Sequence, residues 1–211
     1  MAHYEGKYHE FVHGNLIKIP NYYLFRAKYS KKNYLKYLKG KILEFGSGLS
    51  QNIFLIKDTA EGIDVSDFSI DFSKKKGIKV TKDIKKLKAN SFDSVLSIHC
   101  LEHLENPFDY IKEFYRVLKP SGRLLIVLPT QTKNKPTKNF KPNIGKHLYG
   151  WNFNHINELL NSAKFKIKLN KFNYAYGFSF FYKFSFPLAN SLIQLFGKIR
   201  NKKEMIILVE K

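Results

Sequence analysis

Residues 41–48, Lys-Ile-Leu-Glu-Phe-Gly-Ser-Gly, decide the fold of this chain. The apolar run Ile42–Phe45 is typical of a buried strand, and the glycines at 46 and 48 predict a tight turn after it. Such a turn presents unpaired backbone N–H groups and lets a ligand approach the main chain closely. We therefore expect this stretch to form the first strand and the ligand-binding turn of an α/β domain.

The segments on either side alternate between helix and strand patterns. Helical spacing is expected over 29–38, over 52–56, and after two asparagines that would cap helices, Asn106 before Pro107 and Asn154. Strands are expected at 60–65, 78–80, 92–98, 124–128, 165–169 and 205–209. The all-apolar run 124–128 is typical of a strand buried on both faces of a parallel sheet. This order predicts an α/β fold with an open, doubly wound, mostly parallel sheet.

One domain accounts for the whole chain, because 211 residues, 44% of them hydrophobic, supply a single core. We expect residues 1–28 to form an N-terminal arm or lid. Residues 174–203, rich in phenylalanine and tyrosine, form an insertion between the last two strands. The single cysteine, Cys100, excludes a disulfide framework and a multi-thiolate metal site.

The charge balance is strongly basic, with 37 Lys and Arg against 17 Asp and Glu, a net charge of +20. Such a charge is typical of proteins that bind nucleic acid or anionic membranes. However, 33 of the 37 cations are lysines, which recognise bases and phosphates less specifically than arginines do. Compositional bias and solubility are therefore the favoured explanation, and attraction to anions is the alternative.

Targeting and membrane-spanning segments are not expected. Residues 1–14 contain no hydrophobic core of a signal peptide. The apolar stretch 184–197 is interrupted by Pro187 and is shorter than the roughly 20 residues that span a bilayer as a helix. We therefore expect a cytoplasmic protein, although a helix lying on a membrane surface remains open.

The residues around the glycine turn limit the classes of ligand that it could bind. Leu49-Ser50-Gln51 does not supply the Gly-Lys-Ser/Thr of a phosphate loop, and Gln51 stands where a dinucleotide fingerprint has its third glycine. Glu44 would repel a pyrophosphate but would suit a cationic group such as an amino-acid ammonium. This pattern indicates a cofactor that carries an amino acid.

Two further carboxylates follow at the ends of the next strands. Asp64 lies 20 residues beyond Glu44, the spacing at which a carboxylate accepts hydrogen bonds from ribose hydroxyls. Asp83 follows the third strand and could receive an adenine amino group, with Ile84 packing on the ring. Each aspartate alone is more often a cap or turn residue, but their order at successive strand ends favours ligand binding.

These motifs resemble those of class I S-adenosylmethionine-dependent methyltransferases of the small type-11-like family. Ile42–Gly48 resembles the first motif, Gly62–Ser66 the second, and the stretch 91–129 is similar nearly throughout. Ser50 departs from the pattern, because a glycine is usual there. The resemblance implies a Rossmann-like, seven-stranded sheet with an antiparallel last strand, and S-adenosylmethionine as cofactor. The binding residues it implies are Glu44, Gly46, Ser47, Gly48, Asp64, Val65, Asp83, Ile84 and Ser97.

The family chemistry is displacement of a methyl group from a sulfonium, which depends mainly on alignment in a water-poor pocket. A base would still assist an oxygen acceptor, and we name His99, His103 and His147 as candidates. His103 could instead make a structural hydrogen bond, and His99 should point toward the cofactor edge. His99–His103 matches the H-x-x-E-H metalloprotease pattern, but a strand end and loop are expected there, so a metalloprotease site is not predicted. A resemblance to quinone-biosynthesis O-methyltransferases of this fold leaves open a metal held by His99, Glu102 and His103, although no metal is the favoured expectation.

The acceptor cannot be named from these motifs. We expect methyl transfer to an oxygen or nitrogen of a small-molecule, glycan or lipid-linked acceptor. The insertion at 174–203 could be a flap packed on the sheet. Alternatively, it is an amphipathic element that lies on an anionic membrane or covers an apolar acceptor. The alternative function is a basic RNA-associated protein of the same fold, either an RNA methyltransferase or a non-catalytic binding module. Nucleic acid is the less favoured partner, because His99–Glu102 stands where base amino-methyltransferases carry Asn/Asp-Pro-Pro-Tyr/Phe.

Overall fold

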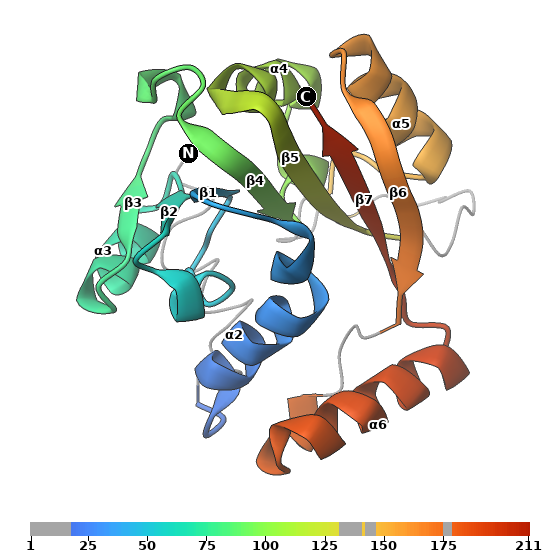
Figure 1. The fold of residues 1–211 in the computed structure, drawn as a ribbon. Coiled ribbons are helices and arrows are strands. Elements are labelled where there is room, and N and C mark those ends of the chain that lie inside the picture. The colour runs from blue at the N-terminus through green and yellow to red at the C-terminus, as the bar shows by residue number, and fades with distance from the viewer. Residues whose placement is uncertain (1–17, 131–140, 142–146, 175–178) are drawn as a thin grey trace.

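The computed structural model describes residues 18–130, 141, 147–174 and 179–211, and the remaining parts of the expected N-terminal arm and insertion lie outside them. Its centre is one seven-stranded sheet of order β3-β2-β1-β4-β5-β7-β6 (Figure 1). The strands from β1 to β5 pair in parallel, and β7 is antiparallel to both of its neighbours. The strands are β1 Ile42–Phe45, β2 Ala60–Ile63, β3 Lys79–Thr81, β4 Phe92–Ile98, β5 Leu118–Pro129, β6 Lys166–Asn173 and β7 Glu204–Glu210. The predicted mostly parallel, Rossmann-like sheet with an antiparallel last strand is confirmed.

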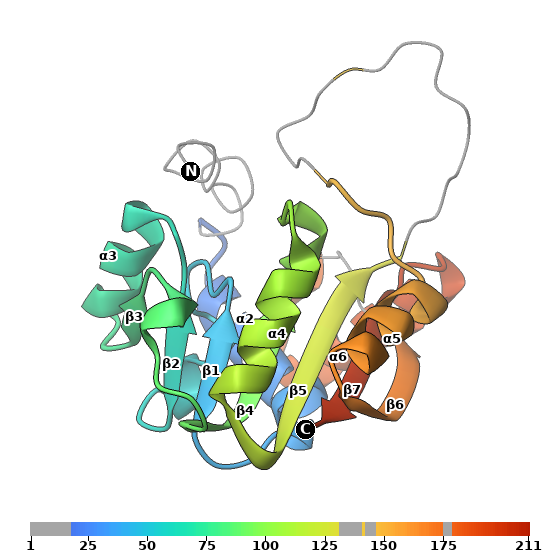
Figure 2. The same cartoon turned by 90° about the horizontal axis from the view of Figure 1, so that it is seen from above.

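Helices cover both faces of the sheet, as Figure 2 shows. Side chains of α2, α3 and α6 pack into the core on one face, and those of α4 and α5 pack into the core on the other. The helices are α2 Tyr22–Asn33, α3 Asp67–Lys75, α4 Pro107–Val117, α5 Phe153–Ser162 and α6 Phe186–Ile199. Short 3-10 turns are η2 Leu35–Tyr37, η3 Phe54–Ile56, η4 Ile84–Lys86, η5 Leu101–His103 and η6 Ser179–Lys183.

The strand β5 shows why the sheet needs both helical layers. Its residues Leu124, Ile126 and Leu128 face the core under α4 and α5, whereas Leu125 and Val127 face the core under α2 and α6. All five side chains are fully buried. The alternation follows from the two-residue period of a strand, and the absence of polar residues follows from burial on both sides.

Several predicted boundaries were wrong for reasons that the packing explains. The helix expected at 29–38 is α2, which begins earlier because Tyr22, Phe25 and Tyr29 form its buried face. The helix expected at 52–56 is only the turn η3, and Asn52 faces inward to contact Glu44. The expected strands at 60–65 and 78–80 are 60–63 and 79–81.

The predicted helix caps were only partly right. Pro107 is the first residue of α4, as expected, but the Asn106 side chain makes no capping hydrogen bond. The cap of α5 is Asn152, whose side chain accepts the His155 N–H, and Asn154 lies inside the helix. An N-cap side chain must reach the backbone N–H two or three residues onward, and Asn152 is the asparagine placed to do so.

Within the described residues, no helix is both long and apolar enough to cross a membrane.

Candidate active site

The carboxyl ends of the parallel strands form one edge of the sheet. The register aligns Phe45 of β1 with Ile63 of β2 and Ser97 of β4, and Ile63 with Thr81 of β3. The residues that follow these positions therefore gather at one edge, where open α/β sheets bind their ligands. Glu44, Asp64 and Asp83 come to this edge from three adjacent strands.

The glycine turn after β1 has two positions that side chains would disturb. Gly46 has a φ of +71°, and a Cβ there would lie 2.4 Å from the Cys100 Sγ. Gly48 has a φ of +51° and nothing within 4 Å of a Cβ built on it. Left-handed backbone favours glycine at both positions, while the open space over Gly48 leaves room for a ligand to approach the main chain.

Asp64 ties this turn to the end of β2. Its Oδ2 accepts the Gly48 N–H at 2.7 Å, and its Oδ1 accepts the Ser66 N–H at 3.0 Å. Val65 beside it is 40% exposed. The carboxylate thus orders the turn, and it sits at the strand end where a ribose would be held.

Glu44 is the most unusual group at this edge, because it is a fully buried acid with one hydrogen bond. Its Oε1 accepts from the Asn52 amide at 2.7 Å, and its Oε2 has no hydrogen-bond partner in the described part of the chain. Burial raises the pKa of Glu44 to about 8, opposed by the Asn52 hydrogen bond and assisted by the nearby Asp64 charge. A cation placed against this carboxyl group would strongly stabilise its ionised form.

Other predicted cofactor residues divide into two groups. The Ser47 and Ser97 hydroxyls are buried without a hydrogen-bond partner among the described residues. Each hydroxyl can therefore still accept or donate a hydrogen bond. Asp83 caps the turn η4 by accepting the Lys85 N–H at 2.9 Å. Ile84 is only 2% exposed and packs in the core beneath α4, and its packing on an adenine ring stays a prediction. Its apolar surroundings hold it inward.

His99 follows the last residue of β4 in a left-handed conformation, with a φ of +49°. Its Nε2 lies 2.9 Å from the Glu204 Oε2 at the start of β7, and its Nδ1 lies 3.9 Å from the Glu102 Oε1. The side chain therefore turns toward β7, not toward the β1–β3 side where we expected the cofactor edge. The left-handed backbone and the buried carboxylate of Glu204 explain this direction.

The pair His99 and Glu204 is electrostatically matched. Burial alone would lower the pKa of His99, but the hydrogen bond and charge of Glu204, helped by Glu102, raise it above its usual value. Burial would raise the pKa of Glu204, but hydrogen bonds from His99, Tyr34 and Asn173 lower it. The two shifts favour an ion pair of imidazolium and carboxylate.

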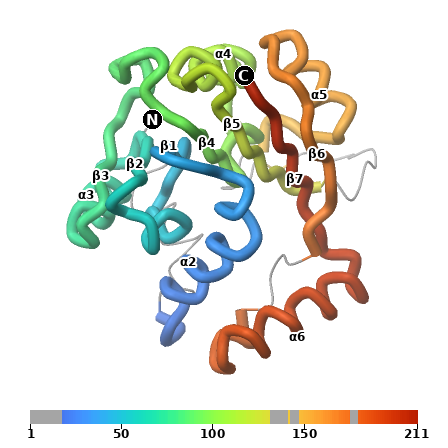
Figure 3. Tube along the Cα trace, viewed as in Figure 1, coloured from blue at the N-terminus to red at the C-terminus, as the bar shows by residue number. Residues whose placement is uncertain are grey.

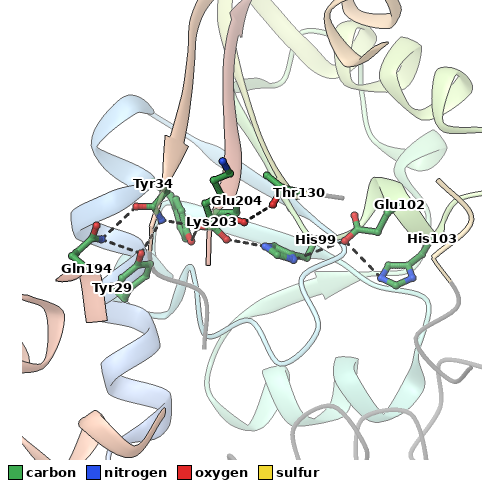
Figure 4. Close-up of polar contacts among 10 residues, drawn as sticks. Tyr29, Tyr34, His99, Glu102, His103, Thr130, Gln194, Lys203 and Glu204 are labelled. Atoms are coloured by element: carbon green, nitrogen blue, oxygen red, sulfur yellow. Dashed lines mark hydrogen bonds and ion pairs between the residues drawn. The ribbon is translucent and has the colours of Figure 1, made fainter. Parts of the chain in front are cut away.

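A buried polar network extends from this pair to α2 and α6, as Figure 4 shows. The Tyr34 hydroxyl donates to the Glu204 Oε1, and the Asn173 amide donates to the same oxygen at 2.6 Å. The Asn173 amide also lies 2.8 Å from the Tyr29 hydroxyl. Sequence reasoning missed this network. A signal was present, since Glu204 is an acid at the head of the apolar run 205–209.

His103 and His147 meet at a third buried acid, Glu102. The His103 Nε2 lies 3.9 Å from the Glu102 Oε1, and the two imidazole rings are 4.8 Å apart. The backbone carbonyl of Glu102 accepts the Leu148 N–H at 2.8 Å, which brings His147 to this place. Burial lowers the pKa of His147, and the charge of His99 lowers it further.

Glu102 itself is fully buried, and neither of its carboxylate oxygens has a hydrogen-bond partner in the described residues. Burial raises its pKa, opposed by the charge of His99. One ligand atom from each of Glu102, His103 and His147 lies within 4.8 Å of the others, so these three could hold a metal ion. The metalloprotease-like set His99–His103 that we discounted is not the grouping formed, because His99 is bonded to Glu204.

The edge thus carries two parts. The cofactor part contains the glycine turn with Glu44, Asp64 and Asp83. The histidine part contains His99, His103 and His147 around Glu102, with Glu204 behind them. Both lie at the carboxyl end of the parallel strands.

Comparisons with known proteins agree with this architecture. Residues 43–126 match the family model described as a methyltransferase domain. A solved S-adenosylmethionine-dependent methyltransferase from Thermotoga maritima is similar with a TM-score of 0.63 and 19% identity, covering 90% of this chain and 89% of its own. Another, from Archaeoglobus fulgidus, has a TM-score of 0.61 and 19% identity, covering 88% and 94%.

The same fold also occurs in the cyclase SpnF, with a TM-score of 0.63, 17% identity and coverage of 90% and 81%. No curated protein sequence matches the chain significantly. At these identities the solved structures establish the fold, and the matched segment contains the glycine turn, Asp64, Asp83 and the β4 end. Residues 43–126 thus match a methyltransferase domain, and the chain as a whole has the fold of solved S-adenosylmethionine-dependent methyltransferases.

Proposed function

We propose that the protein transfers the methyl group of S-adenosylmethionine to an oxygen or nitrogen of a small-molecule, glycan or lipid-linked acceptor. The observation that carries this proposal is the gathering of His99, His103 and His147 around the buried Glu102, beside the cofactor part. Imidazoles are the side chains best suited to take a proton near neutral pH.

The residues of the cofactor part fit S-adenosylmethionine. This cofactor supplies a methyl group on a sulfonium, and its amino-acid end carries an ammonium. Glu44 offers an unpaired buried oxygen for that cation, and Asp64 offers its carboxylate to ribose hydroxyls. The open space over Gly48 allows the ligand to approach the main chain. The unpartnered Ser47 and Ser97 hydroxyls are two further contacts that a bound nucleoside could satisfy.

His99 is the strongest candidate for moving the acceptor's proton. In the neutral ring, which forms above the raised pKa of His99, Nε2 donates to Glu204 and Nδ1 carries the lone pair that takes up a proton. The Glu204 carboxylate stabilises the protonated ring, so it favours proton uptake at Nδ1. His103 and His147 would then position the acceptor or relay the proton to Glu102.

The test is transfer of a tritium-labelled methyl group from S-adenosylmethionine into separated pools of small metabolites, glycans and lipids. We expect label in one pool, and we expect His99→Asn to lower kcat while KM for S-adenosylmethionine changes little. His155→Asn is the matched control, because His155 lies on α5 outside the histidine part. Label found only in RNA would contradict the proposal, and so would full activity of His99→Asn.

An RNA acceptor is the second candidate function, favoured by the net charge of +20. RNA binding should weaken steeply with salt, with a slope that counts the phosphates contacted. Turnover of a small acceptor should change little over the same range. A salt titration of RNA binding, compared with that of S-adenosylhomocysteine binding at the cofactor part, separates the two.

A further inference from the structure

The helix α6 is apolar on two opposite sides. On one side Ala189, Ile193 and Gly197 are buried in the core beneath the sheet. On the other side Leu188, Leu195 and Ile199 are 50%, 53% and 67% exposed. Spacings of seven and four residues place these three side chains on one stripe of the helix. An apolar stripe on a helix is normally buried against a neighbour, and the outer stripe of α6 is exposed in the described structure.

Further exposed apolar groups lie just before α6. Phe180 of η6 is 58% exposed and Phe184 is 41% exposed. Figures 1 and 3 show η6 and α6 together at the outer border of the molecule, beyond the end of β6. Exposed apolar residues gathered in this way mark a surface for a partner or a membrane.

The charge of the same segment identifies the partner. Residues 174–203 contain no Asp or Glu but carry five cations. They are Lys183, Lys198, Arg200, Lys202 and Lys203. Lys198, Arg200 and Lys202 are exposed at the end of α6, next to the most exposed apolar residue, Ile199. An apolar stripe flanked by cations without acids matches the headgroups and acyl boundary of an anionic bilayer.

We propose that the outer surface of α6, formed by Leu188, Leu195 and Ile199 with the cations Lys198 and Lys202, docks on an anionic lipid membrane. The helix has 14 residues and would span only about 21 Å, so it lies on the bilayer and does not cross it. Such docking would fix the location of the protein and does not depend on which acceptor is methylated.

Hydrogen bonds and a short chain segment link the outer surface of α6 to the histidine part. The Gln194 amide of α6 lies 3.4 Å from the Asn173 Oδ1, and Asn173 donates to Glu204. Only residues 200–203 separate α6 from Glu204, the partner of His99. Docking through α6 therefore holds the histidine part near the bilayer.

The test is co-sedimentation of the full chain with two kinds of vesicle, one of phosphatidylcholine alone and one of phosphatidylcholine and phosphatidylglycerol in equal parts. We expect binding to the anionic vesicles only. The triple variant Leu188→Gln, Leu195→Gln, Ile199→Gln should bind at least about tenfold more weakly. The matched control replaces three other exposed apolar residues, Leu55→Gln, Phe68→Gln and Ile167→Gln, and should bind like the wild type.

A charge variant separates local from overall attraction. Lys198→Glu with Lys202→Glu should weaken binding by about fivefold or more for each lysine, whereas Lys74→Glu with Lys75→Glu on α3 changes the net charge equally and should have little effect. None of these variants should alter the thermal shift produced by S-adenosylhomocysteine, which reports the cofactor part. That shift therefore tests the proposed function separately from docking.

Three results would overturn the proposal. One is no binding to the anionic vesicles, and another is equal loss of binding in the α3 charge pair. The third is a dimer in light scattering that the triple variant dissociates, because α6 would then cover a second copy of the chain. If the triple variant does not fold, the two charge variants still decide the outcome.

Discussion

Two buried glutamates at the same edge of the sheet have opposite electrostatic properties. Glu44 in the cofactor part and Glu204 in the histidine part are both almost fully buried, at 0% and 3% exposure. Burial raises the pKa of Glu44 to about 8, yet the pKa of Glu204 lies below its usual value. Burial penalises both charges, so the difference comes from their partners.

The partners differ in number and in charge. Glu44 receives one hydrogen bond, from Asn52, whereas Glu204 receives hydrogen bonds from Tyr34 and Asn173 and pairs with His99. The Glu204 carboxylate of the histidine part is thus electrostatically satisfied as it stands. The cofactor part is complete only when a cation reaches Glu44. This contrast is what a cofactor site and a preformed proton-transfer group would each require.

Replacing Glu44 should give the largest effect on stability. The folded protein keeps a proton on Glu44 up to about pH 8, whereas the unfolded chain loses it near 4.5. Wild-type stability from this group is therefore full at low pH and is lost as pH rises toward about 8. The stability gained by Glu44→Gln over the wild type should grow by about 1.4 kcal/mol per pH unit across this window. Urea unfolding at several pH values measures it.

The same variant should lose ligand stabilisation, because a glutamine amide at this position carries no charge for an ammonium. We expect S-adenosylhomocysteine to raise the Tm of the wild type and to raise that of Glu44→Gln much less. A pH-independent difference between the two proteins would show that Glu44 is ionised in the ligand-free state, and the contrast with Glu204 would then fail.

Replacing Glu204 should have the next largest effect and the opposite sign. Glu204→Gln leaves the His99 imidazolium and the nearby Arg26 without their carboxylate, which should cost about 3 kcal/mol of unfolding free energy. The raised pKa of His99 stabilises the fold at low pH until pH rises through that pKa. The lowered pKa of Glu204 stabilises it above about 4.5. The loss should therefore be greatest between about pH 4.5 and 6.5, where both shifts stabilise the fold.

NMR titration of His99 gives a second readout for Glu204→Gln, since the pKa of His99 should fall when its carboxylate partner is removed. Cofactor affinity should stay nearly unchanged, because Glu204 lies on the histidine side. An unshifted His99 titration would mean that the ring is not paired with Glu204 in solution.

The cofactor part was readable from the sequence because its contacts are local. Gly46 and Gly48 stand beside the strand they terminate, and the bond from Gly48 to Asp64 joins residues only 16 apart. Fixed strand lengths and parallel register then bring Asp64 and Asp83 to the same edge. The order of motifs along the chain is enough to predict that arrangement.

The histidine part could not be read in the same way. His99 and Glu204 are 105 residues apart, and Tyr34 and Glu204 are 170 apart. They meet only because β7 inserts antiparallel between β5 and β6, and the point where Glu204 enters the sheet depends on that register. No local pattern specifies such a meeting. The sequence offers His99 as a candidate base but does not predict that its ring pairs with Glu204.

Asp64→Ala tests whether the cofactor part binds the cofactor. Removing the carboxylate takes away its ligand contacts and its bonds to Gly48 and Ser66, so S-adenosylhomocysteine should bind about 100-fold more weakly by calorimetry. The comparison variant His147→Ala should change that affinity by about threefold or less. A larger loss of affinity in His147→Ala than in Asp64→Ala would exchange the roles of the two parts of the edge.

Tyr34→Phe should have the smallest effect on the unfolding free energy, because it removes a single hydrogen bond to Glu204. The variant removes one donor from a buried carboxylate that keeps Asn173 and His99, so about 1 kcal/mol of unfolding free energy should be lost. Because the lost donor had lowered the pKa of Glu204, acid unfolding should begin at a higher pH than in the wild type. Tyr37→Phe, in the neighbouring turn η2 but without a bond to Glu204, should leave the acid transition in place. If both variants shifted it equally, aromatic packing and not hydrogen bonding would set the charge state of Glu204, and the number of donors would no longer explain why the two glutamates differ.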